Sequence, residues 1–395
     1  MKRVALLCMG LALGAANAAQ AQLTMQMSNG WSFTFSGNVN AFLTYETFGD
    51  DGNTATPGGL IPGGGAESET RIRTGLLPAF AVFDAKGKEG ETDLGVHFGF
   101  APQINCATGQ HDCFGAQIDM RQVYLTVGGG WGQILAGREL GLFGRQNILT
   151  DQTLFGIGAT GSGGTPGAGG AGTTLGRIGF GYIYPQFKAQ MTYSTAAGRP
   201  FQLSIGLFEA AVNGPYTKTE IPRVEAEGVW TGGQTKVWVG ALAQSNKNPA
   251  NDESASSFGA SGGVRFGSST FSLTGSGYYG KGLGTTLLFN AGAIGGAGGG
   301  DDLRKSYGYI GQVTFTPANS KVTIAGSWGS SFLEAADNEG DGKTENSLAS
   351  GGIYFQATKS LKVVGEVNYA WTDDDVDGNE KNTSLAPAFG LMLFF

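Results

Sequence analysis

Long segments of this sequence alternate between apolar and polar residues with a period of two. In the 14-residue segment 32–45, one parity is apolar and the other is polar except for Phe42. The apolar parity consists of Phe33, Phe35, Val39, Ala41, Leu43 and Tyr45. This period places successive side chains on opposite faces of a β-strand. Strands of soluble proteins usually have about 5–6 residues, whereas a strand that crosses a bilayer obliquely needs about 9–11, so the length favours membrane-spanning strands.

The same alternation recurs along the chain, and its second face is rich in Gly, Ser, Thr, Gln and Arg. Membrane barrels have an apolar face toward lipid and a polar face toward a wet lumen, and lipid cannot satisfy an open sheet edge, so such a sheet must close. Short connections, such as 267–269, alternate with long ones, such as 282–304. There are 17 strand candidates, and assigning 177–184 to a long loop leaves an even 16. We therefore predict an all-β, transmembrane antiparallel β-barrel of about 16 strands.

The first residues form an export signal. Lys2 and Arg3 precede the apolar run 4–16, which is too short to span a bilayer as a helix. A small-residue site ends at Ala21. We predict a cleaved signal peptide over residues 1–21 and a single barrel domain over 22–395.

Composition excludes several functional classes. Charged residues make up only 14% of the chain and glycine accounts for 70 of 395 residues, which suits strands joined by turns better than a soluble helical protein. Without Lys2 and Arg3, 23 of the 25 basic residues remain against 32 acidic ones, a net charge of −9. Nucleic-acid binding depends on clustered Lys and Arg, so we expect no nucleic-acid partner.

Two cysteines remain after the signal is removed, Cys106 and Cys113. In an exported chain this spacing predicts a local disulfide that closes a small loop. A zinc site would need more ligands than these two and His111.

The sequence contains no motif for catalysis or for a cofactor. Its two histidines, His97 and His111, have no Ser or Cys partner in a recognisable motif, so we expect no enzyme activity. Residues 373–378 resemble the opening of a calcium loop, but Ser384 stands where the bidentate glutamate is needed. We therefore predict solvated acidic loops and no metal site, with weak divalent-ion contacts left open.

Three stretches resemble the trimeric, 16-stranded general porins of Gram-negative bacteria. Arg121–Val127 leading to Leu135–Arg138 is similar to the paired strands before the family's inward-folded third loop. Lys188–Thr195 followed by Phe201–Phe208 resembles the hairpin after it. The third stretch is the C-terminal alternation, which resembles the signal read by the barrel-insertion machinery and consists of Phe389, Leu391, Leu393 and Phe395. The resemblance implies a homotrimer in the Gram-negative outer membrane, in contact with lipid and lipopolysaccharide.

The resemblance also implies a constriction. In that family the third loop folds into the lumen, and its acidic groups face basic groups on the wall. Mapped here, the loop runs from about 139 to 186. The basic candidates are Arg71, Arg73, Arg121 and Arg138 on the wall, with Arg145 and Arg177 on the flanks of the loop. The acidic candidates are Glu139, Asp151 and, on a strand, Asp119. Charges in a narrow, partly low-dielectric passage act strongly on permeating ions. The alternative is that these groups pair locally, as Asp119 and Arg121 would on one strand.

The expected function is passive diffusion of ions and small hydrophilic solutes through a water-filled channel. One alternative is a substrate-specific channel, which would need a continuous aromatic track along the lumen. A second alternative is a structural or adhesion barrel whose lumen is plugged by the Gly-rich stretch 156–172. The preferred solute and the pore radius do not follow from the sequence.

Overall fold

The computed structural model describes residues 23–49, 58–102, 104, 118–161, 173–212, 214–289, 292–294, 303–337, 339, 341–374 and 379–395. The predicted signal peptide, Cys106 and Cys113 lie outside these residues, so the predicted disulfide does too. Within the described residues, the helices are too short or too polar to traverse a lipid bilayer.

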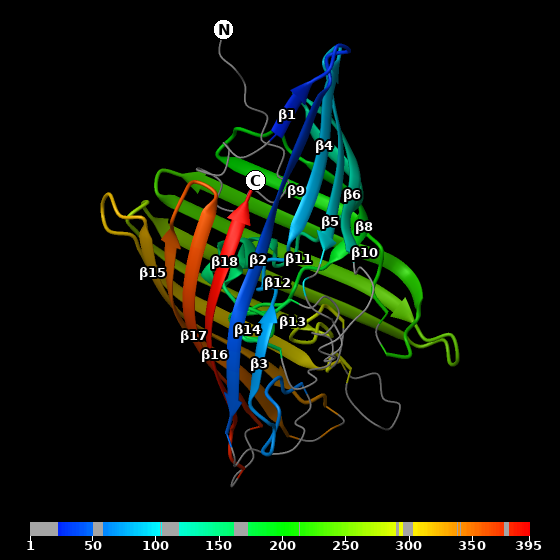
Figure 1. Ribbon diagram of the computed structural model, residues 1–395. Helices are drawn as coiled ribbons and strands as arrows, with labels where there is room; N and C mark the ends of the chain where they lie inside the picture. The colour runs from blue at the N-terminus through cyan, green and yellow to red at the C-terminus, as the bar shows by residue number, and fades with distance from the viewer. Residues whose placement is uncertain are drawn as a thin grey trace.

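One antiparallel sheet closes into a barrel with sixteen strand positions in the part of the chain that the structure describes (Figure 1). β18 pairs with β2 in the register Leu393↔Val39, which closes the barrel. The prediction of 16 strands is confirmed, and residues 177–184 lie outside the named strands, as expected. Fourteen of the positions are occupied by single strands that follow one another along the chain: β5 (Thr92–Pro102), β6 (Ile118–Gly129), β7 (Gly132–Leu140), β8 (Phe187–Ser194), β9 (Phe201–Phe208), β10 (Lys218–Gly232), β11 (Thr235–Lys247), β12 (Ser254–Gly267), β13 (Phe271–Lys281), β14 (Lys305–Phe315), β15 (Val322–Glu334), β16 (Lys343–Gln356), β17 (Leu361–Asp373) and β18 (Asn382–Phe394).

The remaining two positions are β2 (Ser32–Phe48) and a strand divided in two, β3 (Glu69–Arg73) and β4 (Phe80–Glu89). Both halves pair with β2. Between the two halves, residues 74–79 leave the ladder. The N–H of Gly75 donates to the side chain of Asn40 at 2.9 Å, and Pro78 has no N–H to donate. Leu76 and Leu77 are buried as a result.

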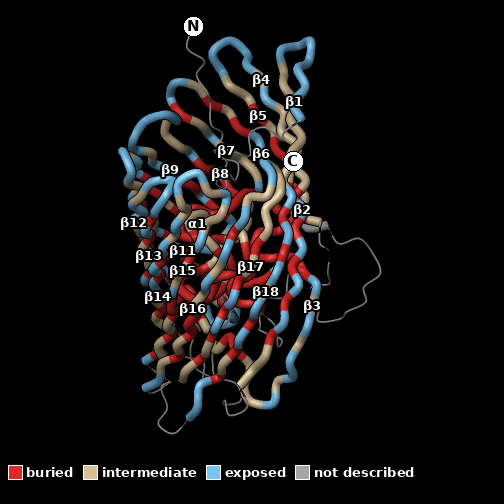
Figure 2. The backbone as a smooth tube through the Cα atoms, turned by 60° about the vertical axis from the view of Figure 1, so that its left-hand side comes forward, coloured by how far each residue is buried: buried red, intermediate tan, exposed pale blue. Residues whose placement is uncertain are grey.

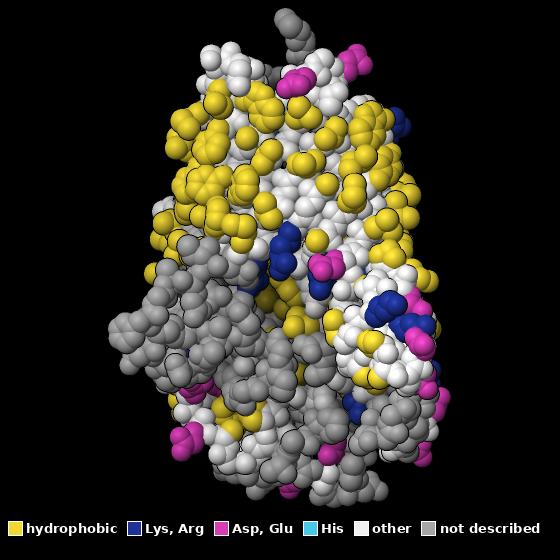
Figure 3. Space-filling view, turned by 90° about the vertical axis from the view of Figure 1, so that its right-hand side faces the viewer, with side chains coloured by type: hydrophobic (Ala, Val, Ile, Leu, Met, Phe, Trp, Pro, Cys, Tyr) yellow, Lys and Arg dark blue, Asp and Glu magenta, His cyan; other side chains and the backbone are white. Residues whose placement is uncertain are grey.

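The two faces of the barrel differ as the alternation predicted. On β2, Val39 and Leu43 are about half exposed on the outer face, whereas Asn40 and Thr44 are buried on the inner face. The tube coloured by burial shows the same alternation along strand after strand (Figure 2). The space-filling view shows a belt of apolar side chains across the face turned to the viewer, with most charged side chains of that face beyond the belt (Figure 3). An outer belt of this kind is the surface that lipid requires.

The connections are short at one end of the barrel and longer at the other. A two-residue turn joins β6 to β7, and the C-terminus lies toward this end (Figure 1). A short additional strand, β1 (Leu23–Gln26), pairs with the start of β2. At the other end, the longest connection, residues 141–186, joins β7 to β8. The strands on either side of this β7–β8 loop have only 8 or 9 residues, against 15 in β10, so the wall is lower on this side.

Candidate functional site at the β7–β8 loop

The β7–β8 loop begins with two short helical turns, α1 (Arg145–Thr150) and η1 (Gln152–Phe155). Gly144 precedes α1 with a φ of 76°, a left-handed conformation that glycine adopts at little cost. Asp151 separates the two turns, and its side chain accepts the N–H of Thr153 at 2.9 Å. This N-cap contact satisfies a donor that the turn itself leaves unpaired.

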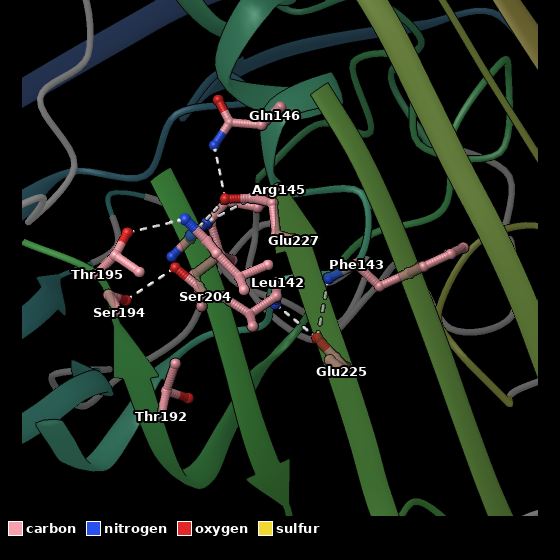
Figure 4. Close-up of polar contacts among 12 residues, drawn as sticks. Leu142, Phe143, Arg145, Gln146, Thr192, Ser194, Thr195, Ser204, Glu225 and Glu227 are labelled. Carbon is pink, nitrogen blue, oxygen red and sulfur yellow. Dashed lines mark hydrogen bonds and ion pairs between the residues drawn. The ribbon is translucent and has the colours of Figure 1, made fainter. Parts of the chain in front are cut away.

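Two carboxylates on β10 hold the start of the loop against the wall (Figure 4). Glu225 accepts the backbone N–H groups of Leu142 at 2.6 Å and Phe143 at 2.9 Å. Glu227 accepts a hydrogen bond from Gln146 at 3.1 Å and forms an ion pair with Arg145. Arg223, on the same strand, lies 2.9 Å from Glu225, and both side chains are fully buried. Charge-assisted hydrogen bonds of this kind are stronger than neutral ones, so they fix where the loop leaves the wall.

A third carboxylate, Glu366 of β17, holds the middle of the loop. It accepts the backbone N–H groups of Ile157 at 3.1 Å and Gly158 at 2.6 Å. The Tyr354 hydroxyl of β16 and the Asn368 amide of β17 also donate to it, each at 2.8 Å. Because β10 and β17 are well separated around the barrel, the loop must cross the interior between these two contacts.

Two further contacts hold the loop on the side of β2 and β3. The Thr160 hydroxyl donates to Glu46 of β2, which also accepts from Ser384 of β18 at 2.7 Å. Arg73 of β3 is 4% exposed and donates from Nη2 to the carbonyl of Thr173 at 2.8 Å. The loop is therefore bound to the inner wall on both sides of the segment 162–172.

The returning part of the loop contains a fully buried arginine, Arg177. It donates to the carbonyl oxygens of Leu348 at 2.9 Å and Ser327 at 2.8 Å, on β16 and β15. Burial lowers the pKa of its guanidinium, because desolvation disfavours the charged form. The Tyr182 hydroxyl donates to Asp151 at 2.9 Å, which joins the returning part to the helical turns.

The charges are arranged differently from the expected basic wall and acidic loop. The wall carboxylates Glu46, Glu225, Glu227 and Glu366 bind the loop, while Arg145 and Arg177 belong to the loop itself. Asp151 belongs to the loop as well, and it accepts its hydrogen bonds from other loop residues. Arg71 lies 3.6 Å from Glu69 on the same strand, which is the local pairing considered as the alternative.

Four other predicted residues lie on β6 and β7. Glu139 is buried on the inner wall, where it accepts from Gln122 at 2.8 Å. Arg121 is the extra residue of a β-bulge, with Nη1 3.4 Å from the Tyr184 hydroxyl of the loop. Arg138 is exposed and has the same parity as Ile134 on the outer face, so it does not line the inner wall as expected. Asp119 is on β6 opposite Ala101, and its side chain is outside the described part.

A cavity of about 390 Å³ lies between the β7–β8 loop and the low part of the wall. Its lining includes Leu76 and Leu77 from the β3–β4 break and Ile148, Leu154 and Ile178 from the loop. The space-filling view of this side shows a hollow below the apolar belt, with apolar side chains in its depth and Lys or Arg side chains at its edge (Figure 3).

Sequence reasoning missed the wall carboxylates because each is a single acid in a strand, without a motif. A usable signal was present. Glu366 shares one face of its strand with Val364 and Asn368, opposite the lipid-facing residues. Glu225 and Glu227 likewise share one face of β10. An isolated inward acid in a barrel strand needs a partner, and a loop that crosses the lumen can provide one.

Comparison with known proteins establishes the family. A sequence model of the Gram-negative porins matches residues 5–376, so the chain belongs to the Gram-negative porin family. A search of curated proteins finds no match. Family and fold make this chain an outer-membrane channel for passive diffusion of solutes, and they point to a channel rather than an enzyme.

Several solved outer-membrane structures are similar in fold. The channel DcaP of Acinetobacter baumannii has a TM-score of 0.68 and 14% identity, over 94% of this chain and 99% of its own. An anion-selective porin from Comamonas acidovorans has a TM-score of 0.62 and 12% identity, over 92% of this chain and 100% of its own. Salmonella typhi OmpF, in complex with daunomycin, has a TM-score of 0.59 and 11% identity, over 94% and 100%. At these identities the likeness concerns the fold alone.

Proposed function

We propose that this chain is a general-diffusion porin with a permanently narrowed lumen. Ions and small hydrophilic solutes pass down their gradients through the space that the β7–β8 loop leaves open. The observation that carries this proposal is the attachment of one loop to the inner wall by carboxylates on β2, β10 and β17. Attachment at three places around the barrel favours a fixed restriction over a mobile lid.

The charged groups around this restriction are the proposed selectivity residues. Arg73, Arg145 and Arg177 contact the loop or belong to it, and Arg71 and Arg121 lie nearby on the wall strands. A solute that passes between loop and wall comes close to these groups in a partly low-dielectric passage, where charges act strongly. We include Glu46 and Glu227 in this set because each has a carboxylate on the inner face that contacts the loop.

Assembly of the channel follows the same proposal. The chain is exported by a signal peptide cleaved after Ala21, and residues 22–395 form the barrel. It assembles as a homotrimer; the Vibrio cholerae protein OmpT, similar in fold with a TM-score of 0.55, has a structure described as a trimer form. The outward side chains of Phe389, Leu391 and Leu393, together with Phe395, form the signal for the insertion machinery. Lipid and lipopolysaccharide surround the trimer.

Single-channel recording in planar bilayers tests the proposed function. Purified protein should give stepwise, ohmic conductance without an energy source. Folded protein that remains silent would instead support a plugged barrel. That alternative has a structural basis, because Phe143 and Ile183 of the β7–β8 loop pack with Leu283 and Leu288 of another connection in the interior.

A further inference from the structure

Two cations lie directly opposite each other on the inner face of the barrel, between the β7–β8 loop and the end with the short turns. Lys236 of β11 is level with Arg265 of β12, and residues opposite each other on antiparallel strands have Cβ atoms about 4.5–5.5 Å apart. Both alternate with outer-face residues, Val237 and Val264, which are exposed. Like charges in this arrangement are unfavourable, so an anion placed between them would relieve the repulsion.

The loop positions one cation of the pair and leaves the other free. Lys236 Nζ donates to Gln146 Oε1 of α1 at 2.6 Å and lies 6.0 Å from the Trp238 ring centroid. Arg265 is exposed, and among the described residues its guanidinium has no hydrogen bond or ion pair. Because this side chain belongs to the inner face of β12, the water around it is the water of the lumen.

The carboxylates that would neutralise the pair are bound elsewhere. Glu227 of β10 forms its ion pair with Arg145. On the turn-side half of strands β11 to β18, all of which the structure describes, the inner face carries one further cation, Lys362, and a single acid, Glu366. Glu366 accepts backbone N–H groups of the loop. This part of the lumen therefore has an excess of positive charge.

We propose that Lys236 and Arg265 bind small solutes with a doubly charged oxyanion, such as phosphate monoesters, in the turn-side half of the lumen. The guanidinium donates two parallel hydrogen bonds to two oxygens of the anion, and the ammonium supplies a compact charge to a third. A phosphate monoester carries a charge of about −1.5 to −2 at pH 7, which matches the two cations. This inference rests on the channel function proposed above and names a class of solute for it.

Titration calorimetry of the folded barrel in detergent tests the site without depending on conductance. The probes are glycerol 3-phosphate, which is doubly charged, and lactate, a singly charged acid of similar size. A hydrogen bond to a charged group contributes about tenfold or more in affinity, so glycerol 3-phosphate should bind at least ten times as tightly as lactate. Added salt should weaken this binding, because it screens the charges. Equal dissociation constants, or no detectable binding of glycerol 3-phosphate, would overturn the proposal.

Two variants localise the binding. Arg265→Gln removes a guanidinium that has no hydrogen bond or ion pair in the described part of the chain, so the barrel should still fold. It should raise the dissociation constant of glycerol 3-phosphate about tenfold or more. Arg199→Gln is the matched control, because Arg199 is an exposed arginine in the turn between β8 and β9. Unchanged binding in Arg265→Gln, or an equal change in both variants, contradicts the assignment.

The source of the phosphate and the channel function are tested separately. Phosphatidylglycerol added to the micelles offers a phosphate in a lipid headgroup. If it displaces glycerol 3-phosphate, the two cations serve a lipid and the solute site is overturned, whereas unchanged binding supports a free solute. Protein that binds glycerol 3-phosphate but stays silent in planar bilayers refutes the channel function alone. Conducting protein that binds both probes equally refutes this site alone.

Discussion

Replacing Glu366 with alanine should loosen the middle of the β7–β8 loop. Glu366 is 3% exposed and is the acceptor for the N–H groups of Ile157 and Gly158. The alanine variant leaves these two donors without that acceptor. It also removes the partner of the Tyr354 hydroxyl. We expect the segment around Gly158 to leave the wall more often, so that the passage fluctuates in width.

The magnitude follows from the contacts that are lost. A hydrogen bond to a charged group contributes about 1.5–3 kcal/mol, so two such bonds favour the bound loop by at least about 3 kcal/mol. Since each 1.4 kcal/mol corresponds to a factor of ten, the released population should rise about 100-fold. Glu366→Gln keeps one oxygen as an acceptor for both N–H groups, so its effect should be smaller. The contacts at Glu225, Glu227 and Glu46 remain in both variants.

Current noise and mean conductance of single channels in planar bilayers measure this fluctuation. Glu366→Ala should increase both, and Glu366→Gln should lie between it and the original chain. Glu253→Ala is the control, because it removes one carboxylate from the exposed turn between β11 and β12. A control for folding compares heated and unheated samples of each variant on a gel. A folded barrel migrates more slowly after heating, because heating unfolds it. Folded Glu366→Ala with unchanged noise and conductance would show that this carboxylate does not hold the loop.

Three further predictions concern ion choice, assembly and the cysteines. The double change Arg71→Gln and Arg73→Gln should shift the reversal potential toward cations at high and low salt, because it removes two positive charges near the loop; an unchanged potential would exclude both from the narrow part of the pore. Deleting Phe395 should reduce the barrel content of isolated outer membranes without reducing synthesis, because its N–H bonds to Gly37 at 3.0 Å and its ring lies 5.3 Å from Phe35; normal assembly would contradict this role. Cys106 and Cys113 should react with a thiol label only after reduction, as read by mass spectrometry, and labelling of the native protein would rule out the disulfide.

Much of the barrel follows from the sequence because the two faces of each strand meet different solvents. Lipid on one side and polar groups on the other impose the alternation seen at Val39, Asn40, Leu43 and Thr44, and the strand count follows from its recurrence. The break after Arg73 was not predicted, because Leu76 and Phe80 continue the apolar alternation. Their burial depends on Asn40 and on the loop, neither of which a local pattern contains.

The site was less predictable than the fold. The length of the β7–β8 loop and its place between β7 and β8 follow from sequence, and Arg73, Arg145 and Arg177 do contact the loop or the wall. The partners of these arginines and of the loop could not be predicted from sequence. Glu366 and Gly158 are about 200 residues apart, and their contact depends on the path of the loop across the barrel. Arg138 was predicted on the inner wall but lies on the outer face, because a shift of one residue along a strand moves a side chain to the opposite face.

Liposome swelling with uncharged sugars of increasing size tests the central claim, that a passive, water-filled path remains beside the loop. The account predicts swelling that needs no energy source, is proportional to the gradient and slows steadily as the solute grows. Absence of swelling with the smallest sugar, or a rate that saturates for one sugar and ignores size, would contradict it.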